Sequence, residues 1–212
     1  MSYSKVDIIN MALGHCGINT IASVDEKTMP AIQASLFWDN ARRTALRDHP
    51  YNFAQARVVL AEKEMPDEYY GDWRHCYALP KDGVRILAVH AGLFAGKTDD
   101  DANVYAWIEQ LPKTHYAIRG GTLYSNAERV AADIVMDITD VSEWDDMFVE
   151  MMARKLACMI AVPLLKNNPN KVQELNSLYR EALNDARSMD VTEESRKNIH
   201  DAWLAAREMS FA

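Results

Sequence analysis

The chain has 212 residues and a net charge of −8, with 49% hydrophobic and 25% charged residues. This composition is typical of a soluble globular protein, and the length suits one large domain or two small ones. The excess of acidic residues argues against nonspecific binding to nucleic acid or to an anionic membrane.

The sequence also lacks the usual signals for export or membrane insertion. The N-terminal stretch MSYSKVDIINMALGHCG has neither the basic start nor the apolar core of a signal peptide. No run approaches the ~18 consecutive apolar residues that a membrane span needs. Cys16, Cys76 and Cys158 are widely spaced and odd in number, which favours reduced thiols made in a cytosol over a disulfide framework.

Residues 1–50 have the periodicity of two helices. Ser4 and Asp7 form a capping-box pattern before the first helix, and Gly17 is a plausible left-handed stop. The second helix should begin near Thr28 and end before Pro50, because the residue before a proline is pushed out of helical geometry. Arg42, Arg43 and Arg47 should lie off its apolar stripe, which consists of Ala34, Phe37, Trp38, Ala41 and Ala45.

Residues 51–140 change to the pattern of β-strands. Short segments rich in β-branched and aromatic residues alternate with Gly, Pro, Asp or Asn. The clearest hairpin is YAIRGGTLY, because Gly120 and Gly121 can adopt the positive φ angles of a two-residue turn. No room is left for crossover helices, so the sheet should be mainly antiparallel. The predicted strand segments are RVVLA, GVRILAVHA, NVYAWIEQL, HYAIRGGTLYS and RVAADIVMDIT.

Residues 141–190 return to helix, and residues 191–212 are expected to form a separate helix or arm. Ser142 should cap the first helix, and Pro163 with the NNPN turn at 167–170 should close it. The next helix should begin near Lys171, with inward-facing Val172, Leu175, Leu178, Tyr179, Ala182 and Ala186. The sequence therefore predicts an α+β fold, in which a β-sheet domain is inserted into an antiparallel helix bundle.

The stretch AGLFAGKTDDD, residues 91–101, superficially resembles a nucleotide-binding loop. A phosphate-binding loop needs G-x-x-x-x-G-K-[ST] before a helix. Here Ala91 stands where the first glycine should be, and a strand-like run follows instead of a helix. The carboxylates of Asp99, Asp100 and Asp101 would repel phosphates. We therefore expect a polar hairpin tip that binds no nucleotide.

Other motifs do not indicate chemistry either. The sequence contains no H-E-x-x-H, G-x-S-x-G or C-x-x-C pattern. His75 and Cys76 are adjacent in a strand and should point to opposite faces, and His15-Cys16 is an equally weak metal signal. Asp145, Asp146 and Glu150 are expected to decorate the first turns of a helix. No catalytic, cofactor-binding or metal-binding residue is predicted, and the Met-rich run MFVEMMARKLACM should be core, or else a subunit interface.

The order of these segments resembles the tail tubular protein A family, the head-to-tail adaptors of short-tailed bacteriophages. The resemblance covers about residues 4–190. Its most specific parts are RRTALRDHPYNFA, the A-L-P-x-D-x-x-R run from Ala78 to Arg85, and SEWDDMF with its continuation. The family often has Trp where this chain has Tyr51, which is a conservative departure. The last twenty residues vary among relatives.

The resemblance implies a structural virion protein and not an enzyme. Members form a twelve-subunit ring at the head-tail junction, between the portal and the tail nozzle, and DNA passes through the channel without specific binding. The protein would be made in the bacterial host cytoplasm. Two alternatives remain open: an adaptor of a long-tailed phage or gene transfer agent with the same fold, and a small hydrolase whose carboxylates are distant in sequence.

Two candidate partner surfaces and one junction follow from this interpretation. The acidic tip Asp99–Asp101 is expected at a ring surface, and residues 191–212 are expected either to reach a neighbouring subunit or the portal, or to pack on their own bundle. The side chains proposed for that contact are Ile199, Trp203, Met209 and Phe211. Tyr51 and Phe53 should turn inward and fasten the sheet domain to the bundle.

Overall fold

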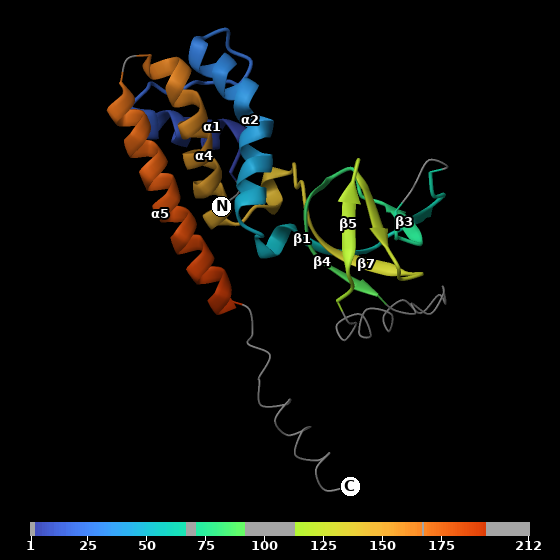
Figure 1. The fold of residues 1–212 in the computed structure, drawn as a ribbon. Coiled ribbons are helices and arrows are strands. Elements are labelled where there is room, and N and C mark those ends of the chain that lie inside the picture. Colours follow the sequence, from blue (N-terminus) through green and yellow to red (C-terminus); the bar gives the residue numbers. More distant parts are fainter. Residues whose placement is uncertain (1–2, 67–70, 92–112, 167, 194–212) are drawn as a thin grey trace, which may run out of the picture.

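The protein is an α+β structure in which strands lie between two pairs of helices along the chain. The computed structural model describes residues 3–66, 71–91, 113–166 and 168–193. Figure 1 shows the helices gathered on one side and the strands on the other. No helix in these ranges is long and apolar enough to cross a membrane. The helices are α1 (Lys5–Cys16), α2 (Met29–Asp48), α4 (Asp146–Leu165) and α5 (Pro169–Glu193).

The ends of α1 and α2 lie where the sequence predicts them. Ser4 Oγ accepts the Asp7 N–H at 3.3 Å, and Asp7 Oδ2 accepts the Ser4 N–H at 2.9 Å, so the capping box is complete. Gly17 ends α1 with φ of 72°, a conformation that costs glycine little. Thr28 precedes α2, and the helix ends at Asp48, two residues before Pro50.

Two predictions about α4 are wrong. Ser142 does not cap the helix; it lies in a short 3-10 turn, Val141–Glu143, and Asp145 is the cap. The Asp145 carboxylate accepts the Phe148 N–H at 2.5 Å, a charge-assisted bond that a serine hydroxyl cannot match. The part assigned to Pro163 is also wrong, because α4 continues past it to Leu165, just before the NNPN segment that is predicted to close the helix. Proline lacks a backbone N–H, but in the last turn of a helix this removes only one backbone hydrogen bond.

Helix α5 begins two residues earlier than predicted and runs past the boundary expected after Asp190. Asn168 Oδ1 accepts the Lys171 N–H at 3.1 Å, which starts the helix at Pro169. Because α5 extends to Glu193, this glutamate lies at the end of a helix and not at the start of a new one. Leu178 is 37% exposed, so its predicted inward position is wrong, whereas Leu175, Tyr179 and Ala186 are buried.

The strands form two antiparallel sheets. One has the order β1-β7-β4 and the other β2-β3-β6-β5. The β5–β6 hairpin turns through Gly120 and Gly121, both with positive φ, as the sequence predicts. Of the predicted strand segments, NVYAWIEQL lies outside the described residues. The strands are β1 (Gln55–Val59), β2 (Glu62–Lys63), β3 (His75–Ala78), β4 (Gly83–Ala91), β5 (Tyr116–Arg119), β6 (Thr122–Ser125) and β7 (Val130–Met136).

Strand β7 connects the two hydrophobic cores of the protein. Ile134 belongs to the core of the sheet domain, together with Tyr77 and Leu123. Val135 is fully buried in the larger core that the helices form. Successive side chains of a strand point to opposite faces. One face of β7 is therefore packed against the sheet domain and the other against the bundle.

Aromatic rings occupy the place where the bundle meets the sheet domain. Phe148 of α4 is fully buried and lies 4.9 Å from the Tyr51 ring centroid and 5.1 Å from that of Phe53. Trp144 lies 4.8 Å from Phe148 and stacks on Trp38 of α2 at 5.9 Å. Tyr51 is buried, as predicted, but Phe53 is only half-buried. Edge-to-face pairs of this kind add to the stabilisation from burial.

We predict that Phe148→Ala lowers the free energy of unfolding by about 3–5 kcal/mol, because it removes the fully buried ring that Tyr51, Phe53 and Trp144 all contact. Phe53→Ala should cost clearly less, since this ring is partly exposed. Urea unfolding of both variants measures the difference, with Leu178→Ala, at an exposed position of α5, as a control expected within ~0.5 kcal/mol of wild type. A loss below about 1 kcal/mol for Phe148→Ala would contradict this description of the core.

Candidate interaction surface

The partner contacts predicted from sequence fall outside the part of the chain that the structure describes. This applies to Asp99, Asp100 and Asp101, and to the Gly-Lys-Thr stretch before them. It also applies to the C-terminal set Ile199, Trp203, Met209 and Phe211. The candidate surface described below therefore consists of other residues.

The histidines and cysteines of the described ranges form no metal site. No three His, Cys, Asp or Glu side chains in these ranges are placed to hold an ion. His75 Nδ1 lies 2.7 Å from Glu62 Oε1, while the neighbouring Cys76 is buried. Burial raises the pKa of the Cys16 thiol to about 11, so this side chain is uncharged at neutral pH and a poor nucleophile.

The carboxylates at the start of α4 have structural roles, as predicted. Asp145 caps the helix and Asp146 lies in its first turn, where the helix dipole favours negative charge. Glu150 accepts a hydrogen bond from Arg154 Nε at 2.7 Å, one helical turn further on.

Asp133 is the centre of an ionic cluster across the β1-β7-β4 sheet, which the sequence did not reveal. Its Oδ1 lies 2.5 Å from Arg57 Nε on β1, and its Oδ2 lies 2.9 Å from His90 Nε2 on β4. Burial alone would raise the pKa of Asp133, but hydrogen bonds from Arg57 and His90 outweigh it and lower the pKa. The group is thus a fixed anion, which suits cross-strand bonding better than proton transfer.

Arg42 corrects the prediction that the arginines of α2 lie off the packed face. Its side chain is only 7% exposed, and its Nε and Nη2 donate to the two carboxylate oxygens of Asp137 at 2.7 and 3.2 Å. Asp39 and Arg43 complete the cluster at 2.7 and 2.9 Å. Asp137 directly follows β7, so this bidentate pair fastens α2 to the sheet.

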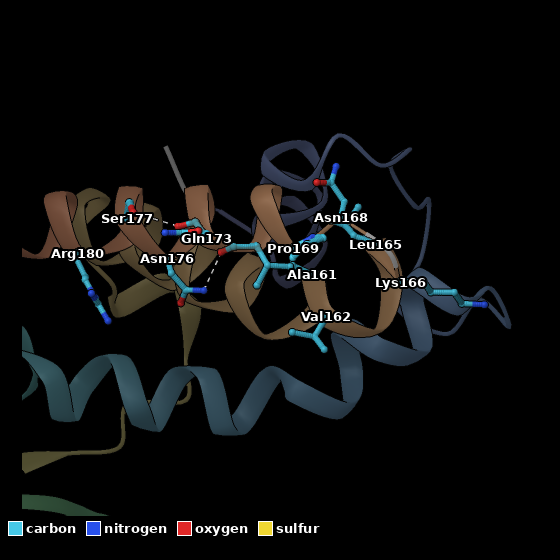
Figure 2. A pocket seen from close by; sticks show the side chains of 11 residues that line it. Ala161, Val162, Leu165, Lys166, Asn168, Pro169, Gln173, Asn176, Ser177 and Arg180 are labelled. Carbon is cyan, nitrogen blue, oxygen red and sulfur yellow. Dashed lines mark hydrogen bonds between the residues drawn. The ribbon is translucent and has the colours of Figure 1, made fainter.

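The described residues form hollows, among them two whose linings contain no aspartate or glutamate. The smaller encloses about 310 Å³ between the end of α2 and strand β4, beside Arg47 and Arg85. The larger encloses about 710 Å³ and lies between the end of α4 and the start of α5 (Figure 2). We call it the α4–α5 groove; its lining is Ala161, Val162, Leu165, Lys166, Asn168, Pro169, Val172, Gln173, Asn176, Ser177 and Arg180.

The first half of α2 exposes a row of large apolar side chains. Met29 is 55% exposed, Ile32 48% and Leu36 68%. Spacings of three and four residues place them on one side of the helix. The buried residues Ala31, Ala34 and Trp38 occupy the opposite side. We call Met29, Ile32 and Leu36 the α2 ridge; a clustered apolar surface of this kind marks an interaction site more often than a scattered one does.

Two sequence comparisons with known proteins identify no relative of the chain. A scan against protein-family models finds no family that matches the chain, and a search of curated proteins finds no match.

We predict that Arg42→Met destabilises the protein by about 3 kcal/mol, because it leaves the Asp137 carboxylate, 7% exposed, without its bidentate partner. Arg43→Met is the matched control. This side chain is 47% exposed and bonds the same carboxylate, so its loss should cost about 0–1 kcal/mol. Thermal and urea unfolding measure both. Equal losses for the two variants would show that Arg42 does not fasten α2 to the sheet.

Proposed function

We propose that the protein is a structural subunit of a head-to-tail adaptor ring, which lies between the portal of a bacteriophage head and the tail nozzle. The resemblance of residues 4–190 to the tail tubular protein A family motivates the proposal. The fold supports it, since helices at both ends of that range enclose a sheet domain in sequence, the order that the resemblance implies. In this role the chain binds copies of itself, the portal protein and a tail protein.

The observation that carries the proposal is the α2 ridge. Three large apolar side chains on a well-packed bundle helix face away from the subunit's own core. Their exposure costs free energy in an isolated chain, and burial against another subunit would recover it. A protein whose function lies in repeated contacts around an axis needs such a surface and does not need a catalytic cleft.

The charge of the chain is consistent with DNA passage. A net charge of −8 per subunit gives a ring little attraction for the DNA backbone, because acidic surfaces gain nothing from counterion release. A channel wall of this kind would let DNA slide through without being held.

The alternatives differ in what they require. An adaptor of a long-tailed phage or gene transfer agent would use the same fold and differ in the tail protein that it binds. A hydrolase would need carboxylates with perturbed pKa in a concave site. In the described residues Asp7, Asp133 and Asp140 have lowered pKa values, and none of them lines either hollow. No observation favours the hydrolase.

We predict that negative-stain images of the purified full-length chain, alone and mixed with the portal protein of its own virus, show rings of about twelve subunits stacked coaxially on the portal. Leu36→Asp should remove most of these rings and leave the far-UV circular dichroism of a folded chain, because Leu36 is exposed in the single chain. A chain that stays monomeric and does not bind the portal at micromolar concentration would refute the adaptor function.

A further inference from the structure

We infer that the α2 ridge of one copy docks in the α4–α5 groove of the next copy, so that these two surfaces form the contact repeated around the ring. The inference rests on the proposed ring and specifies which residues build it. It assigns Met29, Ile32 and Leu36 to one side of the contact, and Val162 of α4 with the first turns of α5 to the other.

The ridge is convex and points away from its own subunit. The three side chains lie opposite the face of α2 that packs against α4. From Met29 to Leu36 the ridge is roughly 10 Å long, at 1.5 Å per residue. In the second half of α2 the same side of the helix carries Asn40, Arg43 and Arg47. The apolar part is thus a short segment with defined ends.

The groove is concave, and its lining includes apolar residues of both helices, among them Val162 and Leu165 of α4 and Val172 of α5. Val162 is 64% exposed although it lies on α4, the helix that packs against α1, α2 and α5. Figure 2 shows Val162 of α4, and Asn176 and Arg180 of α5, pointing to the same side of the two helices. From Pro169 to Arg180 the α5 side of the groove is roughly 16 Å long. It is therefore long enough for the ridge, and polar groups at its margin can bond to the incoming helix.

Charge makes the two surfaces complementary. Lys166 and Arg180 are the charged residues that line the groove. An acidic residue stands near each end of the ridge. Asp25 is exposed four residues before Met29, with exposed Lys27 between them, and the Asp39 side chain, which pairs with Arg42, is still 78% exposed one turn after Leu36. The Asp39 carboxylate of a second copy can thus approach the positive groove margin while the ridge meets apolar lining residues.

The positions of the two surfaces suit a contact that repeats in one direction. Figure 1 shows α2 and α5 at the two outer edges of the bundle, with α4 between them. A contact between two different surfaces is head-to-tail, so each copy uses its ridge on one neighbour and its groove on the other, and the chain of copies closes when the rotation between them permits. Closing the ring strengthens the assembly. The final contact forms between two ends of the same assembly and therefore at a high effective concentration.

Cysteine cross-linking tests the inference. The double variant Leu36→Cys/Val162→Cys, treated with a short bismaleimide, should give a ladder of dimers, trimers and larger species on a denaturing gel. Each single variant alone should give no more dimer than wild type, and an equimolar mixture of the two should give dimers only. Both positions are exposed in the single chain, so each variant should still fold. The wild type controls for its half-buried Cys158.

A matched double variant, Leu36→Cys/Leu178→Cys, places the second thiol on a different side of α5 and should give no ladder. The inference is wrong if the Leu36→Cys/Val162→Cys variant yields no more than this control. It is equally wrong if Leu36→Cys alone gives abundant dimers, since the ridge would then pair with itself. Rings in the images without a ladder would leave the adaptor function standing and remove this contact. A ladder whose species never close into rings would support the contact and contradict the adaptor function.

Discussion

The buried guanidinium of Arg42 determines how the two halves of the molecule are joined. A charge that is 93% removed from solvent is stable only if it is paired, and both carboxylate oxygens of Asp137 meet it from the end of β7. Asp137 and Val135 lie two residues apart and so share a face of the chain. Val135 is buried in the helical core. The ion pair and the apolar contact therefore require the same orientation of the sheet domain against α2.

This fixed junction explains why the exposed surfaces lie where they do. Helix α4 packs against α1, α2 and α5, so the inner faces of all the helices are occupied by the subunit itself. At the end of α2, Asp48 accepts bonds from Lys155 of α4 at 2.9 Å and Tyr179 of α5 at 2.8 Å. The α2 ridge and the α4–α5 groove remain outside. Contacts made by these surfaces would hold the sheet domain at a constant position in every copy.

The sequence-based predictions are correct for the features that interactions between neighbouring residues determine. The Ser4–Asp7 capping box, the Gly17 stop and the Gly120-Gly121 hairpin depend on a few neighbouring residues, and each lies where expected. The errors concern choices made by distant residues. Arg42 is buried because Asp137, 95 positions away, is there to pair with it. The exposure of Leu178 reflects which side of α5 meets α4.

The candidate surfaces were beyond sequence reasoning for the same reason. In the sequence, Ile32 and Leu36 look like ordinary helix residues. The burial of Ala34 and Trp38 shows which side of α2 faces inward, and therefore that Ile32 and Leu36 face outward. The α4–α5 groove joins Val162 to residues of the next helix, and its shape depends on where α4 ends after Pro163. The division of the strands into two sheets, with β7 shared between two cores, is likewise a property of long-range pairing.

If the Arg42–Asp137 junction fixes the sheet domain, the bundle and the sheet domain move as one body, and native-state hydrogen exchange measures this directly. Amides of β7 and of α4 should open with the same free energy, within about 1 kcal/mol of that for global unfolding, because one junction holds both. If the β7 and β4 amides instead exchange through an opening about 3 kcal/mol lower than that of α4, the sheet domain unfolds or detaches independently. The Arg42–Asp137 junction would then not fix its position.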